Sequence, residues 1–318
     1  SLGTKAKAVF TEWTYKVTDR LGATAGVRYT DEKKSLQGTL LNVAPASAPE
    51  PANFPTALCP FNGAPPTQTG CLFLSTAPFR LKFSDTTLSG SIQYRWNDAA
   101  MTYASYSEGF KSGGFNQRYN AAPPGNAPIS FGAETAKTLE IGAKLNPLPS
   151  LRINAALFTT DYDDIQMTYR LGVVPLLFNA GKARIKGGEL EVTWSVSSHL
   201  HVDASAGYLD SGFRQITPPP PFGSVSPTAT ATLASRLPFT PDWTTHVGVA
   251  YDLVFGNGWT LTPRVDSSFT GAQFFDAGNS REVSQMGGVT LWNASVALES
   301  PDSKWRLSAN AQNLGEIG

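Results

Sequence analysis

Three histidines, His199, His201 and His246, are the clearest candidates for acid–base chemistry in this chain. His201, Asp203 and Ser205 follow one another at every second position, so in a strand they would share one face. A Ser-His-Asp triad needs side chains that converge on one point, whereas these residues would lie in a line. The sequence also contains no GxSxG, HExxH or P-loop motif. We therefore expect no enzyme and no catalytic residue.

The two cysteines, Cys59 and Cys71, lie in one long segment, 35–78, that is rich in Pro, Ala and Asn. A close pair within one loop is typical of a disulfide formed in an oxidising compartment. Two free thiols are the alternative. The segment contains no histidine, so a zinc site would lack ligands. We expect a Cys59–Cys71 disulfide, no metal site and no cofactor.

The strands that must position the histidines are clearest in the stretch 178–209, which contains His199 and His201. Leu190 and Val192 alternate there with Glu189 and Glu191, and the same pattern continues beyond a short polar turn. Alternation with a period of two indicates strands with one apolar and one polar face. Strands of soluble sheets usually have five or six residues. Strands of this length are typical of a barrel that spans a membrane, apolar toward lipid and polar toward a wet lumen.

The rest of the chain repeats this unit. Strands are expected at 4–17, 21–34, 79–96, 100–110, 134–145, 151–167, in the hairpin 178–209, and at 239–253, 259–271, 289–299 and 304–314. Short links fall near residues 19, 98, 147, 198, 257 and 302, and long loops fall between them. The pattern predicts an all-β, antiparallel up-and-down transmembrane barrel of about 12 strands, with short periplasmic turns and long extracellular loops.

Composition agrees with this prediction. Lys and Arg (25) balance Asp and Glu (25), which argues against a nucleic-acid partner. No run of eighteen apolar residues suggests a transmembrane helix. Six aromatic residues on the apolar parity lie near short links, where a girdle at the membrane boundary is expected: Tyr15, Trp96, Trp194, Tyr251, Trp259 and Trp305.

Several segments resemble, in order, the C-terminal half of the barrel of TonB-dependent outer-membrane receptors. They are AGVRYTDEKK (25–34), YASYSEGFKSGGFN (103–116), ETAKTLEIGAK (134–144), FTTDYDDIQ (158–166), NAGKARIKGGELE (179–191) and NAQNL (310–314). The resemblance spans nearly the whole chain, 1–318. The sequence departs from the family pattern in having no plug domain, no TonB box and no final aromatic strand. We therefore expect a fragment of a larger barrel, of about 22 strands.

The resemblance implies a multi-pass protein of the outer membrane of a Gram-negative bacterium, surrounded by lipid. It implies uptake of a scarce ligand, most often a ferric siderophore, energised by the TonB-ExbB-ExbD complex through the missing N-terminal region and plug. Cobalamin, haem or a glycan are alternative ligands, and a passive porin-type channel is an alternative function. The glycines at 187 and 188 are expected to permit strand curvature or close approach.

Ligand contacts are expected at the loops rather than on the strands. Aromatic and Arg side chains at the loop roots suit an anionic, partly aromatic chelate. Girdle or loop-anchoring roles are the alternative. The candidates are Phe115, Asn116, Gln117, Arg118, Tyr119, Tyr169, Arg170, Phe213, Arg214, Phe274, Phe275 and Arg281.

Overall fold

The computed structural model describes residues 2–37, 39–42, 71–74, 78–116, 129–171, 174–217, 231–279 and 284–315. At 39–42, 71–74, 170–171 and 174–175 only the backbone is described. The expected disulfide of Cys59 and Cys71 lies outside the described side chains and stays a prediction. Of the described residues, none form a helix long and apolar enough to cross a membrane.

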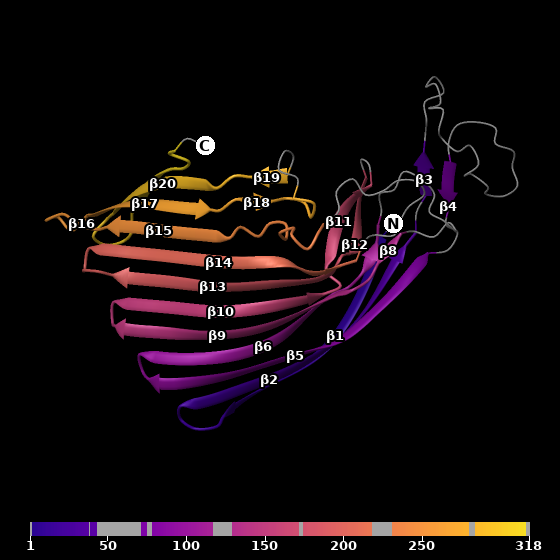
Figure 1. Cartoon of the computed structure of the whole chain (residues 1–318). Helices are drawn as coiled ribbons and strands as arrows, with labels where there is room; N and C mark the ends of the chain where they lie inside the picture. The colour runs from indigo at the N-terminus through magenta and orange to yellow at the C-terminus, as the bar shows by residue number, and fades with distance from the viewer. Residues whose placement is uncertain are drawn as a thin grey trace, which may run out of the picture.

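One curved antiparallel sheet dominates the chain (Figure 1). Its strand order follows the sequence: β1 (Leu2–Lys16), β2 (Leu21–Leu36), β5 (Phe79–Asn97), β6 (Ala100–Lys111), β9 (Glu134–Leu148), β10 (Leu151–Asp163), β13 (Gly181–Ser195), β14 (Leu200–Ile216), β15 (Trp243–Tyr251), β17 (Thr260–Thr270), β20 (Val289–Glu299) and β21 (Arg306–Ala311). The short β16 (Leu253–Val254) also pairs with β17. The predicted meander of about 12 long strands is confirmed.

Short turns and long connections separate to opposite ends of the sheet (Figure 1). The turns that join β1 to β2, β5 to β6, β9 to β10 and β13 to β14 all lie at one end, which we call the short-turn end. The opposite end is called the long-loop end. Polar side chains close the tight turns: Ser197 Oγ, for example, accepts hydrogen bonds from the amides of His199 and Leu200. The described ends of the long connections therefore lie at the opposite rim.

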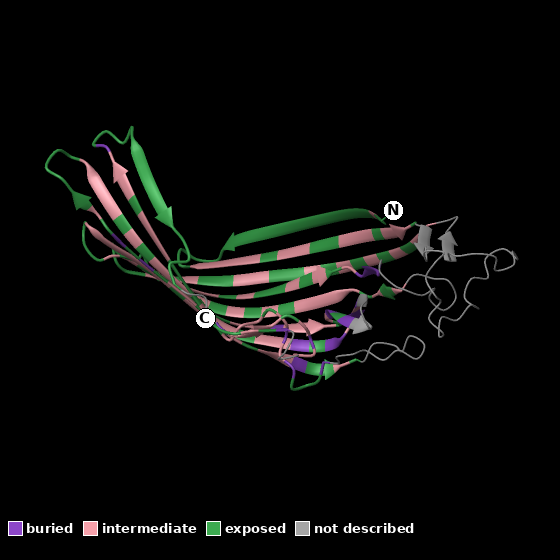
Figure 2. Cartoon of the chain, turned by 90° about the horizontal axis from the view of Figure 1, so that it is seen from above, coloured by how far each residue is buried: buried purple, intermediate pink, exposed green. Residues whose placement is uncertain are grey.

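The two faces of the sheet differ in chemistry, because side chains alternate along every strand. One face carries large exposed apolar residues, such as Val9 (67% exposed), Trp13 (61%) and Ile92 (58%). We call this the apolar face, and the other the polar face. Of the six expected girdle aromatics, all but Trp259 are strongly exposed. Figure 2 shows this alternation as stripes of exposed and intermediate residues, with buried residues gathered toward the long-loop end.

Small hairpins extend the strands at the long-loop end. They are β3 (Thr39–Asn42) with β4 (Cys71–Leu74), β7 (Gly114–Phe115) with β8 (Ser130–Phe131), β11 (Gln166–Leu171) with β12 (Val174–Asn179), and β18 (Gln273–Phe274) with β19 (Gln285–Met286). The sequence-based expectation of continuous loops at 35–78 and 168–177 is wrong at these strands. A short apolar run, CysLeuPheLeu at 71–74, forms a local ladder with 39–42 within a Pro-rich segment.

The expected strand 151–167 is also divided in two. β10 ends at Asp163, and Asp164 has a left-handed backbone (φ 54°) before β11 begins. Short polar residues such as Asp adopt this conformation more readily than others. Two consecutive aspartates, Asp163 and Asp164, interrupt the alternation at this point, a signal that the expectation of one continuous strand did not use.

The two adjacent glycines of β13 allow close approach, as expected. A Cβ on Gly187 would lie 2.7 Å from the carbonyl oxygen of Tyr208 and 2.5 Å from Phe158 Cζ. A Cβ on Gly188 would lie 2.8 Å from Leu157 Cδ2. Adjacent residues of a strand point to opposite faces of the sheet. The missing side chains of Gly187 and Gly188 therefore leave space for Phe158 on one face and for Leu157 on the other.

Candidate functional site

A small buried core lies at the long-loop end, on the polar face. Phe213 of β14 and Ala183 of β13 are cross-strand partners and share the parity of the polar residues of their strands. The hairpin β11–β12 and residues from two further connections pack with them. The buried members are Met167, Tyr169, Leu176, Phe178, Ala180, Ala183, Phe213, Ala231, Leu237 and Ala277. We call this set the loop core.

Two residues with left-handed backbones turn the hairpin β11–β12 away from the line of β10 and β13. Asp164 has φ 54° and Gly181 has φ 113°. Between them, the amide of Ile165 donates to the carbonyl of Gly181 (2.9 Å), and that of Ala180 donates to Ile165 (2.7 Å). A side chain on Gly181 would meet the backbone of Gln215. Glycine is therefore required here by both backbone conformation and space.

Amide side chains tie this hairpin to the neighbouring β7–β8 hairpin. Gln166 Nε2 donates to the carbonyls of Ser112 (3.0 Å) and Gly132 (2.9 Å). Asn179 Oδ1 accepts from the amide of Gly132 at 2.6 Å. Asn116 exchanges two hydrogen bonds with the backbone of Leu177. These bonds satisfy backbone groups that no regular ladder pairs, so the two loops are held as one unit.

Tyr169 is the largest fully buried side chain in the described part of the chain, at 2% exposure. Its hydroxyl has no hydrogen-bond partner among the described residues. Burial raises the pKa of this hydroxyl above its usual value. A buried hydroxyl without a partner costs free energy, so the loop core contains an unmet polar group.

The structure separates the sequence-predicted ligand contacts into groups. Four of them are buried: Phe115 (9% exposed), Asn116 (7%), Tyr169 (2%) and Phe213 (4%). Arg214 is exposed and follows Phe213 in β14, so it points to the apolar face. Phe274 is partly buried, and Phe275 is 45% exposed beside Phe239, with ring centroids 5.5 Å apart. Gln117, Arg118, Tyr119, Arg281 and the side chain of Arg170 lie outside the described residues.

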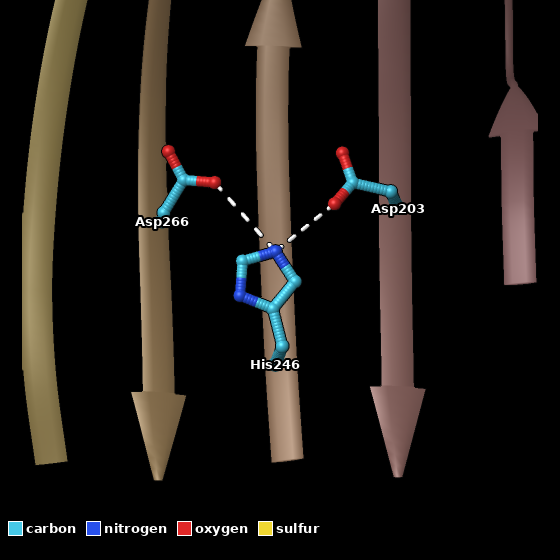
Figure 3. Close-up of side chains that lie close together, drawn as sticks. All are labelled: Asp203, His246 and Asp266. Carbon is cyan, nitrogen blue, oxygen red and sulfur yellow. Dashed lines mark hydrogen bonds and ion pairs between the residues drawn. The ribbon is translucent and has the colours of Figure 1, made fainter. Parts of the chain in front are cut away.

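A second polar cluster lies on the polar face of β14, β15 and β17, nearer the short-turn end. Figure 3 shows His246 between Asp203 and Asp266, which come from the two strands on either side of it. His246 Nε2 is 3.0 Å from Asp203 Oδ2 and 3.7 Å from Asp266 Oδ1. Arg264 bonds both carboxylates, with NH1 2.7 Å from Asp203 Oδ1 and Nε 3.0 Å from Asp266. Gly248 pairs with Asp203 and Asp266 and carries no side chain where the guanidinium of Arg264 lies.

The ligand atoms of Asp203, His246 and Asp266 lie within 4.8 Å of one another, as a metal site would require. Arg264 occupies the same carboxylate oxygens, however, and brings a fixed positive charge. A divalent cation would have to displace this guanidinium. The cluster is therefore an ion-pair network, in which one guanidinium bridges two carboxylates, rather than a metal centre.

Two chains of Ser, His and Asp also occur here. Ser268 Oγ lies 3.0 Å from His246 Nδ1, and Ser195 Oγ lies 3.1 Å from His201 Nδ1. The second chain continues from His201 to Asp252 at 3.2 Å. Ser268 is paired in the ladder on both sides, so its neighbourhood provides no free amides for an oxyanion hole. The predicted linear arrangement of 201, 203 and 205 missed these links, because the register of β14, β15 and β17 creates them.

Comparison with known proteins identifies the family to which this architecture belongs. The family model described as TonB dependent receptor-like, beta-barrel matches residues 1–314. The pesticin receptor of Yersinia enterocolitica is 24% identical over 279 residues, which cover 86% of this chain and 34% of that protein. The chain therefore spans about a third of the length of this curated relative.

Solved structures agree on the fold. The ferric yersiniabactin uptake receptor FyuA from Yersinia pestis aligns with a TM-score of 0.71 at 21% identity, over 98% of this chain and 41% of that one. The siderophore receptor PiuA from Acinetobacter baumannii aligns with a TM-score of 0.67 at 17% identity, over 98% and 39% of the two chains. The chain belongs to the TonB-dependent receptor-like β-barrel family, and its sheet is a segment of a Gram-negative outer-membrane barrel.

Proposed function

We propose that this chain forms part of the barrel of an outer-membrane receptor that takes up a ferric siderophore. Uptake is energised by the TonB-ExbB-ExbD complex, acting through a plug domain of the same gene product. The ligand enters at the long-loop end, which faces the cell exterior. The observation that carries the proposal is the loop core, which draws several outer loops together on the polar, lumen-facing side of the wall.

The arrangement of residues at the long-loop end supports the binding of a bulky ligand. Hydrogen bonds that the side chains of Asn116 and Gln166 donate, and that the side chain of Asn179 accepts, fix two loops against each other, so they present one formed surface. Fixed loops lose less conformational freedom on binding. Aromatic and arginine residues flank this surface in sequence, notably Arg118 and Arg281. Arginine and aromatic rings suit an anionic chelate with aromatic groups.

Passive diffusion is the alternative mechanism, and cobalamin, haem or a glycan are alternative ligands. The relatives named above include receptors described as taking up ferric yersiniabactin and siderophores, which favours an iron chelate. A porin would need an open lumen, whereas the loop core occupies the polar face at the outer rim.

The test uses the complete gene product in a host that lacks its own siderophore receptors. We expect it to restore growth under iron limitation with defined ferric siderophores, and to fail when TonB is deleted. Uptake that persists without TonB would contradict active transport. TonB-dependent uptake of labelled cobalamin, haem or glycan, without uptake of any siderophore, would retain active transport and overturn the ligand class.

The ligand-contact candidates have their own test. Replacing Arg118 and Arg281 together with Ala should weaken binding of the transported chelate by at least about tenfold, because two charge-assisted contacts are lost. The control is Arg28→Ala, which removes one arginine charge from a strand outside the loops. Unchanged affinity in the double variant would remove these two residues from the site.

A further inference from the structure

Two amide side chains at the base of the hairpin β11–β12 end at the same glycine. Gln166 and Asn179 are cross-strand partners and form the first residue pair of the hairpin. Gln166 Nε2 donates to the carbonyl of Gly132 (2.9 Å), and Asn179 Oδ1 accepts from the amide of Gly132 (2.6 Å). Gly132 lies between β8 and β9. The base of the hairpin is thus attached to the neighbouring connection through the backbone of one residue.

Asn179 also reaches a third segment of the chain. Its side-chain nitrogen lies 2.8 Å from the carbonyl oxygen of Asp164, which follows β10. It lies 3.2 Å from the carbonyl oxygens of Gly132 and Ala133. The two N–H groups of one amide therefore serve backbone carbonyls on both sides of the hairpin base. A single side chain joins β12, the end of β10 and the start of β9.

The space for this amide exists because residue 132 has no side chain. A Cβ on Gly132 would lie 3.1 Å from Asn179 Oδ1 and 3.6 Å from Asn179 Cγ. The shorter of these contacts is closer than an unstrained van der Waals contact, so the amide would have to move. Gly132 and Asn179 therefore fit each other as a pair.

The direction of the hairpin relative to the barrel wall depends on its base. β11 and β12 form a two-stranded sheet of their own, outside the main sheet. Asp164 and Gly181, both with left-handed backbones, flank this small sheet where it leaves β10 and β13. An isolated two-stranded hairpin has little stability of its own. Its place above the polar face is set by the bonds at the base and by the packing of the loop core.

We propose that Asn179 is the residue that positions the hairpin β11–β12 at the long-loop end of the barrel. The hairpin carries Tyr169 and Arg170, two of the expected ligand contacts, so its position decides where these residues stand. The inference rests on the proposed function in one respect, that the ligand enters at this end. Asn179 is a positioning residue, because it acts on the ligand site through the hairpin.

The first experiment measures how often the hairpin leaves its place. It uses the complete gene product in outer membranes, with Ala183→Cys as a reporter, because Ala183 is buried in the loop core at 1% exposure. Reaction of this thiol with N-ethylmaleimide is followed by mass spectrometry of the peptide that contains it. Asn179→Asp keeps the size and the acceptor oxygen of the side chain and removes both N–H donors. We expect labelling to be at least about tenfold faster in this variant, since the lost hydrogen bonds raise the open fraction.

A second variant tests the same junction from its other side. Gly132→Ala adds a methyl group against Asn179 and changes no charge. It should also speed labelling, and its effect should be less than additive with that of Asn179→Asp, because both changes disrupt one contact. Ala277→Cys, buried at 2% exposure in another connection of the loop core, is the second reporter. Assembly of every variant is checked by its heat-dependent shift on gels.

Two matched variants serve as controls. Gly212→Ala adds the same methyl group at the long-loop end of β14, where no described atom would lie within 4 Å of it. Asn257→Asp makes the same chemical change in an exposed turn at the short-turn end. Both should leave the labelling rate unchanged.

A role in positioning also differs from a role in overall stability. The thermal midpoint of the barrel should be the same in Asn179→Asp and wild type, because the main ladder is intact. Uptake is measured with ferric yersiniabactin, a ferric catecholate and a ferric hydroxamate. For each chelate that is taken up, the half-saturating concentration should rise at least about tenfold in Asn179→Asp and the maximal rate should be retained, because apparent affinity falls with the fraction of receptors whose hairpin is in place.

Three results would overturn the inference: unchanged labelling in Asn179→Asp with both reporters, a lowered thermal midpoint of the barrel, or an unchanged half-saturating concentration for a transported chelate. Fully additive effects of Asn179→Asp and Gly132→Ala would also contradict it, because the two residues would then act separately. If none of the three chelates is taken up, the uptake proposal fails, whereas the labelling rates still decide whether Asn179 positions the hairpin.

Discussion

The side-chain amide of Asn116 exchanges two hydrogen bonds with the backbone of Leu177, in the pattern that paired residues of neighbouring strands form. Asn116 Nδ2 donates to the carbonyl of Leu177 (2.8 Å), and the amide of Leu177 donates to Asn116 Oδ1 (2.7 Å). The two residues are 61 positions apart and belong to different outer loops. The Asn116 amide therefore contributes two of the hydrogen bonds that couple the β7–β8 and β11–β12 hairpins, together with those of Gln166 and Asn179.

Replacing Asn116 with Ala should loosen this junction. Both backbone groups of Leu177 would lose their partner, at a local cost of about 1–3 kcal/mol. We expect faster hydrogen–deuterium exchange at 174–179 with unchanged exchange in β13. Thr168→Ala, an exposed change in the same hairpin, is the control. Equal protection of 174–179 in Asn116→Ala and wild type would show that packing and the bonds of Gln166 and Asn179 hold the loops together without Asn116.

Tyr169→Phe should stabilise the ligand-free loop core. The change removes a buried hydroxyl that has no partner among the described residues, a gain of about 1–3 kcal/mol, and keeps the ring against Phe178. The measurement is local protection of 166–171 and 174–179 in hydrogen exchange. Reduced protection would mean that the hydroxyl has a partner in the complete receptor. A parallel loss of affinity for the transported ligand would identify that partner as the ligand.

Because the Tyr169 hydroxyl is buried, we expect the stability of the loop core to depend on pH in the alkaline range. Burial raises the pKa of Tyr169 above that of the unfolded chain, near 10. The loop core therefore keeps its full stability below about pH 10 and loses stability as the pH rises beyond it, because the unfolded chain releases the proton more readily. Local exchange in 174–179, corrected for its intrinsic pH dependence, should rise above pH 10 in the wild type. In Tyr169→Phe this additional rise should be smaller.

Gly187→Ala and Gly188→Ala should differ, although the two glycines are adjacent. A methyl group at 187 meets the carbonyl oxygen of Tyr208 at 2.7 Å, which is backbone and cannot move without disturbing β14. A methyl group at 188 meets the end of the Leu157 side chain, which can rotate. We expect Gly187→Ala to destabilise the barrel by about 1–3 kcal/mol and Gly188→Ala to have a smaller effect. Thermal unfolding of the assembled receptor in detergent measures the difference, and equal effects would contradict this account.

Arg264→Ala should convert the polar cluster into a metal-binding site. Removing the guanidinium frees the carboxylates of Asp203 and Asp266 while leaving His246 between them. One His and two carboxylates are suitable zinc ligands. We expect the variant to bind zinc at least about tenfold more tightly than the wild type, as measured by isothermal titration calorimetry. Adding Asp203→Ala should abolish the gain, and equally weak binding by wild type and Arg264→Ala would show that the three side chains do not converge once the arginine is removed.

The sequence by itself determined the meander, its faces and its family. Alternation such as Leu190 and Val192 against Glu189 and Glu191 depends only on the two-residue period of a strand, which is a local property. Tight turns near residues 98, 147 and 198 placed the short connections at one end for the same reason. Long strands with a sustained period left little freedom in the choice of element.

The tertiary structure decided how distant residues meet. Periodicity could not place His246 between Asp203 and Asp266, because that contact depends on the register of three strands. It could not show that Asn116 and Tyr169, expected as ligand contacts, are buried in the loops, since their partners are up to 61 residues away. The pairing of Lys5 with Lys33, and of Lys33 with Lys82, is likewise not visible in the sequence of any one strand. Each of these arrangements is non-local, and only pairing of the strands fixes it.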